Sequence, residues 1–349
     1  MSELLQARQL LAALGRRARL LGAAVLGSAM VFGLQAAAQD KPLTPIVWGV
    51  DSFLTTLPQR IAEDKGFFKE EGVAITLRVS ALGVESMDQI IAGEADLGNG
   101  AHWALVNRMA RPNIGVGGFI LAWRVPVCLM ATGQVKTLAD LKGHKIAVIA
   151  GSVWDWYLDR ALAKAGLTAK DVEVMNFGSP VDYLAAAARG DVDAGWFWES
   201  NYARAKEVLG QQGWTCIATR ADVAPQSAID GHGPLPVSLK SVAEKPEAIA
   251  GALRAYKRAG DWCHANVDEC ATLANKLIGA PVEDAKKLIP DLGWYVGTSD
   301  EYIPLLQDMK DFALARGIIK KENDYDLASK IVFGPAKQAF PNGTGELPK

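Results

Sequence analysis

The stretch Ile146-Ala-Val-Ile-Ala-Gly-Ser152-Val-Trp154-Asp155 decides the architecture, because it carries a buried strand through a glycine into the start of a helix. Strands followed directly by helices are the units of parallel, helix-covered sheets. Such a junction also leaves backbone N–H groups pointing into open space, where anions bind. We therefore expect an α/β fold with a binding site at the end of this strand.

A second stretch, Gly190-Asp-Val-Asp-Ala-Gly-Trp196-Phe-Trp198-Glu199, reads as a helix end followed by a strand tipped with tryptophan and a carboxylate. Alternation along a strand places Trp196 and Trp198 on one face and Phe197 on the other. The tryptophan face can stack an aromatic ligand or hold an ammonium group, and Glu199 favours the ammonium. Together the two stretches predict one cleft for a small molecule, and neither contains an evident activated nucleophile.

The bulk composition sets limits on the class of protein. The chain has 349 residues, 50% hydrophobic and 22% charged, which is typical of a soluble globular protein of about two domains. A formal net charge of −2, without a long run of Lys or Arg, gives no reason to expect a nucleic-acid partner. The four histidines show no ligand-pair spacing, so we expect neither a metal site nor a cofactor.

Residues 1–38 read as a secretory signal peptide. Arg16, Arg17 and Arg19 precede the apolar run Leu20–Leu34, and Ala36-Ala37-Ala38 supplies the small residues of a cleavage site. We expect cleavage between Ala38 and Gln39 and a periplasmic location, with Sec and twin-arginine export both open. A retained membrane anchor is the alternative, although the apolar run is short for a membrane span.

Export places the four cysteines in a space where disulfides persist. Cys263 and Cys270 would lie about 10 Å apart along one unbroken helix, which is too far to bond. The segment Ala265–Asp268 looks like a break, with Asn266 capping a second helix, and across that corner a disulfide is feasible. Cys128 and Cys216 lie on separate predicted strands, so a disulfide and two buried free thiols both remain open.

Strands and helices alternate along most of the chain, which predicts mainly parallel sheets flanked by helices. From Pro246 onward the apolar residues recur at helical spacing, and the tail after Gly334 is rich in Pro and Gly. The expected strands are Ile46–Val50, Val73–Val79, Ala95–Leu97, Ile114–Trp123, Val125–Ala131, Ile146–Ile149, Val172–Asn176, Ala194–Trp198 and Thr215–Ala218.

Four segments resemble the periplasmic substrate-binding proteins of ABC importers for nitrate, alkanesulfonates and taurine, of which the taurine and sulfonate binders look nearest. They occur in the order found in that family and lie behind a signal peptide. The segments are Ile61-Ala-Glu-Asp-Lys-Gly-Phe-Phe-Lys-Glu-Glu-Gly72, Ile90-Ile-Ala-Gly-Glu-Ala-Asp96-Leu-Gly-Asn99, Leu138-Ala-Asp-Leu-Lys-Gly143-His-Lys-Ile-Ala-Val148 and Ala186-Ala-Ala-Arg-Gly190-Asp-Val-Asp193-Ala.

The resemblance implies a two-lobed periplasmic-binding-protein fold of type II, with the ligand held between the lobes. Lobe 1 would comprise residues 45–131 and 233–335, and lobe 2 residues 132–232. It further implies a monomer without enzymatic activity, which captures a small organic ion by lobe closure and delivers it to an ABC permease in the inner membrane.

The candidate ligand-binding residues fall at the carboxyl ends of expected strands, where open α/β sheets bind their ligands. Most of them have a purely structural alternative, which is helix capping for Ser152, Asp155 and Asp182, packing for the tryptophans, and solvation for Glu199. The candidates are Ser52, Phe53, Thr55, Asn99, His102, Arg124, Ser152, Trp154, Asp155, Asp182, Trp198 and Glu199. At Glu199 the sequence departs from the family, in which a proline often stands two residues after the tryptophan.

The ligand itself stays open at this stage. A taurine-like aminosulfonate, or another sulfonate, would use both the helix start at Ser152 and the carboxylates Asp155 and Glu199. An aromatic carboxylate or sulfonate, or another nitrogen-containing compound, would stack on the tryptophans. A periplasmic ligand-presenting sensor subunit is an alternative to transport. A pyrimidine synthase of the same fold is disfavoured by the scattered cysteines and the signal peptide, and Gly-x-Ser-x-Gly is absent.

Overall fold

The computed structural model describes residues 42–80, 83–123, 127–149, 152–223, 232–298 and 302–341. The chain divides into two units, residues 1–43 and 44–349, and all elements below belong to the second unit. The predicted signal peptide and its cleavage site lie outside the described residues. Among the helices of the described part, none is long and apolar enough to cross a membrane.

One layer of strands, called here the first sheet, contains the start of the described chain. It is made of β1 (Thr44–Val50), β2 (Val73–Val79), β3 (Ile114–Trp123), β9 (His232–Ser238) and β10 (Leu292–Gly293). β1 and β2 are parallel, whereas β3 pairs antiparallel with both β9 and β10. Leu97 joins these two groups into one layer, because it bridges Trp48 on one side and Val237 on the other.

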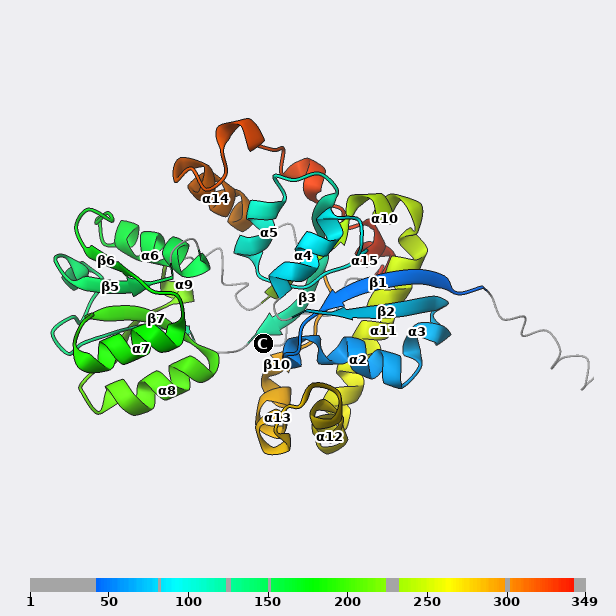
Figure 1. Ribbon diagram of the computed structural model, residues 1–349, viewed down its shortest axis with the longest axis horizontal. Coiled ribbons are helices and arrows are strands. Elements are labelled where there is room, and N and C mark those ends of the chain that lie inside the picture. Colours follow the sequence, from blue (N-terminus) through cyan, green and yellow to red (C-terminus); the bar gives the residue numbers. More distant parts are fainter. Residues whose placement is uncertain are drawn as a thin grey trace, which may run out of the picture. The chain divides into compact units, whose positions relative to one another are not determined.

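Helices cover both faces of the first sheet (Figure 1). On one face Trp48 of β1 packs in the same buried cluster as Ile61 and Tyr256, which lie on α2 and α11. On the other face α5 carries Trp103 into a second cluster, where its ring lies 5.7 Å from that of Phe312 on α14. The helices of this part are α2 (Leu57–Asp64), α3 (Phe67–Glu70), α4 (Gly83–Ile91), α5 (His102–Arg108), α10 (Leu239–Glu244), α11 (Pro246–Ala265), α12 (Val267–Ile278), α13 (Val282–Leu288), α14 (Tyr302–Ala315) and α15 (Gly334–Ala339).

The second sheet has five strands in the order β6-β5-β7-β4-β8. β5 pairs in parallel with β6 and β7, whereas β4 pairs antiparallel with β7 and β8. The strands are β4 (Val127–Ala131), β5 (Lys145–Val148), β6 (Glu173–Asn176), β7 (Ala194–Trp198) and β8 (Thr215–Thr219), and the helices are α6 (Val153–Lys164), α7 (Pro180–Arg189), α8 (Glu199–Gly210) and α9 (Arg220–Val223).

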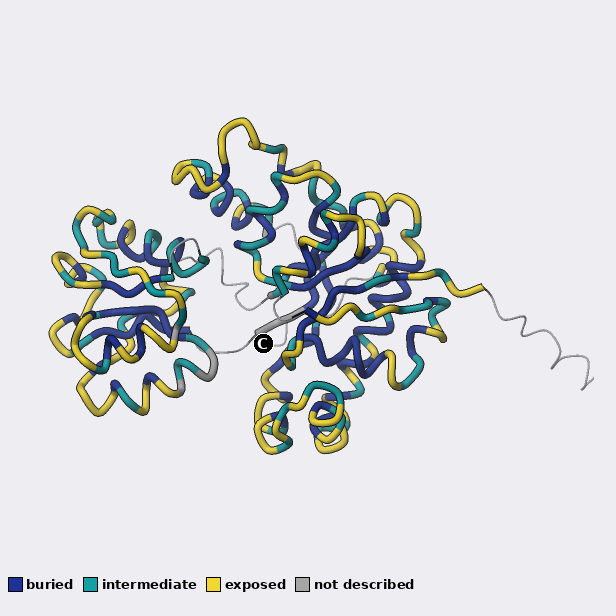
Figure 2. Tube along the Cα trace, in the orientation of Figure 1, coloured by how far each residue is buried: buried dark blue, intermediate teal, exposed yellow. Residues whose placement is uncertain are grey.

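The side chains of β7 alternate between the two faces of the second sheet, as the sequence predicts. Trp196 belongs to the buried cluster on the α6 side, which includes Trp156. Phe197 belongs to the cluster on the α7 and α8 side, which includes Tyr183. Figure 2 shows buried central strands between helices whose outer faces are exposed, and the edge strands β6 and β8 are more exposed than β4 and β7. The expected α/β class with helix-flanked sheets is therefore confirmed, and both sheets are mixed, with parallel ladders at β1–β2, β5–β6 and β5–β7 and antiparallel ladders around β3 and β4.

One strand is placed differently from the expectation. The sequence analysis assigned the strand ending at Ala131 to lobe 1, but β4 pairs with β7 and β8 and so belongs to the second sheet. β3, which ends at Trp123, lies in the first sheet, whereas β4, which begins at Val127, lies in the second. β8 of the second sheet ends at Thr219, and β9, which begins at His232, lies in the first sheet again. An all-apolar strand, buried on both faces, does not reveal from its own sequence which sheet contains it.

Both disulfides left open by the sequence are present in the structure. Cys263 of α11 bonds Cys270 of α12 across the expected helix break, with Cα atoms 5.1 Å apart. At that break the Asn266 side chain donates to the Trp262 carbonyl (2.8 Å), so it closes α11 and does not cap α12. Cys128 of β4 bonds Cys216 of β8, with Cα atoms 5.7 Å apart.

Candidate ligand-binding site

The loop that follows β1 is built around the buried carboxylate of Asp51. This side chain is 5% exposed and accepts hydrogen bonds from the Phe53 amide (3.1 Å), the Thr56 hydroxyl (3.0 Å) and the Asn99 side-chain amide (3.2 Å). The hydrogen bond to Asn99 joins two loops that are 48 positions apart in the chain. Asp51 therefore serves as an internal acceptor, and it is not a carboxylate left open for a ligand amine.

Arg60 supplies the positive charge beside this carboxylate. Its guanidinium donates to the Thr56 hydroxyl (3.1 Å), and only 7% of the residue is exposed. Burial lowers the pKa of Arg60 from its ordinary value, while the charges of Asp51 and Glu63 act in the opposite direction. The loop is thus a closed polar network in which donors and acceptors satisfy one another.

Around this network the predicted first-lobe residues differ in exposure. Phe53 is 54% exposed although its backbone is held by two neighbours, because its amide donates to Asp51 and its carbonyl accepts from the Thr56 amide (3.1 Å). Ser52 is exposed and Thr55 is half-buried. The phenylalanine is the one large apolar group that this rigid loop presents to solvent.

Asn99 and His102 lie on the neighbouring loop. Asn99 is 9% exposed, and Gly100 follows it with φ +147°, where an added Cβ would lie 2.3 Å from the Met87 side chain. The positive φ favours glycine here, whereas the flexible end of the Met87 side chain could move aside. His102 begins α5, and its ring centroid lies 6.1 Å from that of Phe119. The structure therefore brings Asn99 to the β1 loop and packs His102 against an aromatic side chain of β3.

The start of α6 shows the cap that the sequence predicts. The Ser152 hydroxyl accepts the Trp154 amide (3.2 Å), and the Ser152 carbonyl accepts the Asp155 amide (3.2 Å). The backbone amides of Val153, Trp154 and Asp155 are those that an anion would meet at this helix start, and two of the three therefore donate to Ser152 itself. An anionic head group at this point would compete with those bonds or use the Val153 amide.

An aromatic stack occupies the same end of the second sheet. Trp154 lies over Trp198, with ring centroids 4.1 Å apart and planes inclined by 21°. Its ring centroid is 6.4 Å from that of the buried Trp196 and 5.6 Å from that of Tyr157. Trp154 and Trp198 are both half-buried, so this stack is an apolar surface that still meets solvent.

The strand beneath the stack is fixed by Tyr183 of α7, whose hydroxyl donates to the Trp196 carbonyl. Burial raises the pKa of Tyr183 far above its ordinary value, so the phenol remains a neutral donor. The indole nitrogen of Trp196 is buried and has no hydrogen-bond partner among the described residues. The stack therefore lies on a rigid support that contains one unused donor.

The two predicted carboxylates Asp155 and Asp182 have different surroundings. Asp155 lines a pocket on another face of α6 together with Asp159, Asn176 and Arg316, and Arg316 donates to Asp159 (3.1 Å). The Asp182 carboxylate accepts the hydroxyl of Ser179 (2.8 Å), the N-cap of α7. Asp182 thus makes the local capping contact that was its structural alternative.

The remaining candidates can be placed only in part. Arg124 lies outside the described residues. Glu199 is the first residue of α8, but its side chain is not among those described. The sequence analysis missed Val181, which follows Pro180 at the start of α7 and is 70% exposed. A valine in the first turn of a capped helix carries no signal of its own in a single sequence.

Nothing in the described part of the chain resembles a metal centre, since no three His, Cys, Asp or Glu side chains gather there as ligands. The described candidates offer polar loops at one sheet and an aromatic surface at the other. Their chemistry is that of recognition by hydrogen bonds, stacking and a helix start.

These strand-end loops on two helix-flanked sheets are the features of a periplasmic binding protein, and comparison with solved structures agrees. The chain is similar to the periplasmic aliphatic sulphonate binding protein of Escherichia coli, with a TM-score of 0.67 and 21% identity over 82% of this chain and 91% of that one. The chain has the periplasmic-binding-protein fold. It belongs to the NMT1/THI5-like family, whose model matches residues 56–270.

Related sequences carry different descriptions. A "Putative binding protein" of Brucella abortus (strain 2308) is 27% identical over 283 residues, which cover 73% of this chain and 85% of that protein. A "Putative aliphatic sulfonates-binding protein" of Escherichia coli (strain K12) is 32% identical over 160 residues, 45% of this chain and 47% of that protein. A 4-amino-5-hydroxymethyl-2-methylpyrimidine phosphate synthase of Aspergillus parasiticus is 26% identical over 227 residues, 59% of this chain and 62% of that protein.

Proposed function

We propose that this chain is the extracytoplasmic solute-binding protein of an ABC importer, which captures a small organic ion by closure of its two lobes and delivers it to the permease. One observation carries this proposal above the others. The carboxyl ends of β1 and β7, on two different sheets, present a polar network and an aromatic stack, as ligand sites of open α/β sheets do.

The first property to assign is the charge of the ligand's head group. The relatives named for sulfonates favour an anionic head, and the start of α6 at Ser152 is the helix N-terminus available for it. A taurine-like aminosulfonate would in addition place its amine near carboxylates, for which Asp155 and Glu199 are our candidates. Our proposed ligand is therefore an aminosulfonate or another small sulfonate.

A second candidate ligand is favoured by the aromatic stack. Trp154 and Trp198 are only half-buried and their planes are nearly parallel, so a flat ring can extend the stack. Phe53 adds an exposed ring at the first sheet. An aromatic carboxylate or sulfonate would use these three side chains and would leave Asp155 without a role.

The partner of the loaded protein is the second part of the proposal. We place the mature chain in the periplasm as a monomer, cleaved between Ala38 and Gln39, with a permease in the inner membrane as its acceptor. A ligand-presenting sensor subunit would use the same cleft and a different acceptor. Release of an unchanged ligand separates a binding protein from an enzyme such as the pyrimidine synthase among its relatives.

A thermal-shift screen of residues 39–349 tests the ligand. A compound that binds only the folded state raises the melting temperature, and the stabilisation grows with the logarithm of its concentration above Kd. The panel contains taurine, ethanesulfonate, benzenesulfonate, benzoate, nitrate and choline. We expect the largest shift with an organic sulfonate, and mass spectrometry should recover that ligand unchanged. A panel without any shift would contradict the proposed ligand class, and turnover would contradict the binding role.

Variants at the two carboxylates separate the two ligand candidates. Asp155→Asn or Glu199→Gln should weaken taurine sharply and leave benzenesulfonate nearly unaffected, because only the zwitterion has an amine to pair. Glu173→Gln, an exposed carboxylate on β6 of the same sheet, is the matched control. Equal taurine binding by all three variants would show that these carboxylates do not pair with an amine.

A further inference from the structure

The Cys128–Cys216 disulfide lies where the second sheet joins the rest of the chain. Cys128 is the second residue of β4, the first element described after residues 124–126. Cys216 is on β8, and α9 follows it and ends at Val223, the last residue described before 224–231. The bond therefore ties together the strand by which the chain enters the second sheet and the strand by which it leaves.

The strand pairing at this point is irregular, so the backbone alone holds it weakly. β8 is the edge strand of the sheet, and its only ladder partner there is β4. The register of that ladder shifts between Leu129 and Met130, which marks a bulge. A disulfide beside a bulge keeps β8 from slipping along β4 and stabilises one register.

Cys128 lies one position along β4 from the residue opposite Trp198, and it belongs to the cluster on the other face of the sheet from Trp154 and Trp196. In the ladder with β7, Val127 is opposite Trp198 and Cys128 is opposite Phe197. β4 therefore connects the disulfide to the end of β7 that carries Trp198, where the described pairing of β7 is with β4. Any shift of β4 at Cys128 moves the backbone on which Trp198 stacks against Trp154.

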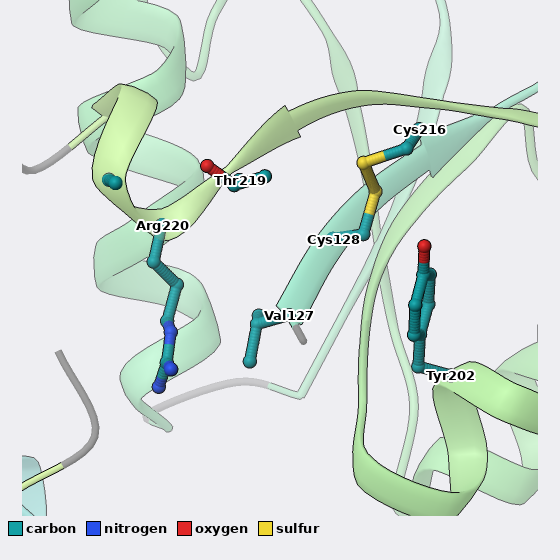
Figure 3. Close-up of a pocket in the computed structure, with 7 residues that line it drawn as sticks. Val127, Cys128, Tyr202, Cys216, Thr219 and Arg220 are labelled. Atoms are coloured by element: carbon teal, nitrogen blue, oxygen red, sulfur yellow. A yellow bond between two sulfur atoms is a disulfide. The ribbon is translucent and has the colours of Figure 1, made fainter. Parts of the chain in front are cut away.

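The bond is also open to solvent on one side. Cys128 is 1% exposed, but Cys216 is an exposed residue, and the two line a shallow pocket with Tyr202, Thr219 and Arg220 (Figure 3). A small reductant can therefore reach the sulfur of Cys216. The other disulfide joins two residues that are both fully buried, Cys263 and Cys270.

We propose that the Cys128–Cys216 disulfide is a positioning element of the aromatic stack, which holds β4 in register and thereby keeps Trp198 parallel to Trp154. Cys263–Cys270 closes a segment with a sequence separation of 7 between two helices of the other part, whereas Cys128–Cys216 closes one with a separation of 88 that contains β5, β6, β7 and the helices between them. Opening Cys128–Cys216 should disturb the stack, and opening Cys263–Cys270 should not.

The test uses the exciton couplet that two stacked indoles give in circular dichroism. The chain has ten tryptophans, so the couplet is isolated as the difference between each protein and the same protein carrying Trp198→Phe. We expect the Cys128→Ala/Cys216→Ala variant to lose most of the couplet while it keeps its helical signal. The Cys263→Ala/Cys270→Ala variant should retain the couplet. Retention in both variants, or equal loss in both, would overturn the proposal.

A second measurement covers a variant that does not fold. The unmodified protein is reduced at room temperature and alkylated, and mass spectrometry identifies which cysteines have reacted. Alkylation of Cys216 should abolish the couplet before the helical signal changes. A couplet that survives until the helical signal itself is lost would contradict the positioning role. Neither measurement requires a ligand. A negative result would therefore overturn the role of the disulfide and would leave the proposed transport function to be tested separately.

Discussion

The loop after β1 and the start of α6 are the same structural feature, a strand end that leads into a helix, built in two different ways. The first is a polar network, in which Asp51 accepts three hydrogen bonds and binds Asn99 from another loop. The second is an aromatic stack, in which Trp154 covers Trp198. One side of the proposed site is therefore preformed by hydrogen bonds, whereas the other offers apolar surface area.

The two sides should contribute differently to binding. A preformed polar loop loses little conformational entropy on binding and fixes the orientation of a ligand. An exposed aromatic surface contributes binding free energy when the ligand removes it from water. That free energy depends on the contact area and hardly on the direction from which the ligand approaches. We therefore expect substitutions at the Asp51 network to affect the fold first, and those at the tryptophans to affect the ligand first.

The largest effect on stability should come from Asp51→Ala. The substitution leaves the buried Asn99 amide without its acceptor and removes one acceptor of the Thr56 hydroxyl, which keeps the Asp51 carbonyl (2.7 Å). It also removes a charge that acts on the buried Arg60. Leaving a buried donor unsatisfied costs up to about 3 kcal/mol. Urea denaturation of the mature chain measures this loss.

The control for that substitution is Asp182→Ala. Asp182 is exposed, and it accepts only the Ser179 hydroxyl among the side chains described around it. Loss of a capping contact costs about 1 kcal/mol. Equal losses for the two variants would contradict the view that the first loop is a closed network.

The next effect is on the aromatic side, where Trp198→Ala removes the stacked partner of Trp154. We expect about 2 kcal/mol of lost stability, less than for a fully buried tryptophan because Trp198 is half-buried. Binding of benzenesulfonate should weaken by about tenfold, the equivalent of about 1.4 kcal/mol. Isothermal titration calorimetry measures the second quantity, with Trp198→Phe as the variant expected to retain most of the affinity.

The placement of these groups was predictable to different degrees. The pattern of β7 predicts that Trp196 and Trp198 share a face, because strand alternation is local, and the structure places Trp196 and Phe197 in different clusters. The Ser152 cap is local too, and the Trp154 amide confirms it. A contact within four or five residues follows from backbone geometry alone.

Contacts between distant segments could not be predicted from one sequence. Asp51 and Asn99 are 48 positions apart, and no local pattern predicts their hydrogen bond. Trp154 and Trp198 were expected at one cleft because both follow strand ends, and the structure brings them together, but the direct stacking of their rings was not predicted. Their meeting depends on strand order, which a single chain of alternating elements does not specify. The same reason explains why β4 was assigned to the wrong sheet, since its partners β7 and β8 follow it much later in the chain.

A smaller effect should separate two similar caps, Ser152 of α6 and Ser179 of α7. Both accept a backbone amide of the first turn, from Trp154 and Asp182 respectively, at 3.2 Å. Ser152→Ala and Ser179→Ala should therefore each cost about 1 kcal/mol of stability. Only Ser152→Ala should also weaken sulfonate binding. Equal affinities for both variants would place the anionic head group away from the start of α6.

The smallest effect concerns the pH dependence of the second sheet and its helices. Hydrogen bonds from the backbone and side chain of Thr219 lower the pKa of Asp222 below its ordinary value of 3.8. Because the folded-state pKa lies below the unfolded one, the unfolded chain takes up the proton first as the pH falls. The stabilisation is therefore complete well above pH 3.8 and is lost as the pH falls through the folded pKa.

Thr219→Val should remove the side-chain part of this effect and raise the pKa of Asp222 toward its ordinary value. Carboxylate NMR titration measures that pKa directly, and acid denaturation measures the accompanying loss. Thr219 is opposite Cys128 in the β4–β8 ladder, but its bonds to Asp222 are local, so opening Cys128–Cys216 should leave this pKa unchanged. A pKa raised by reduction would contradict the local origin of the effect.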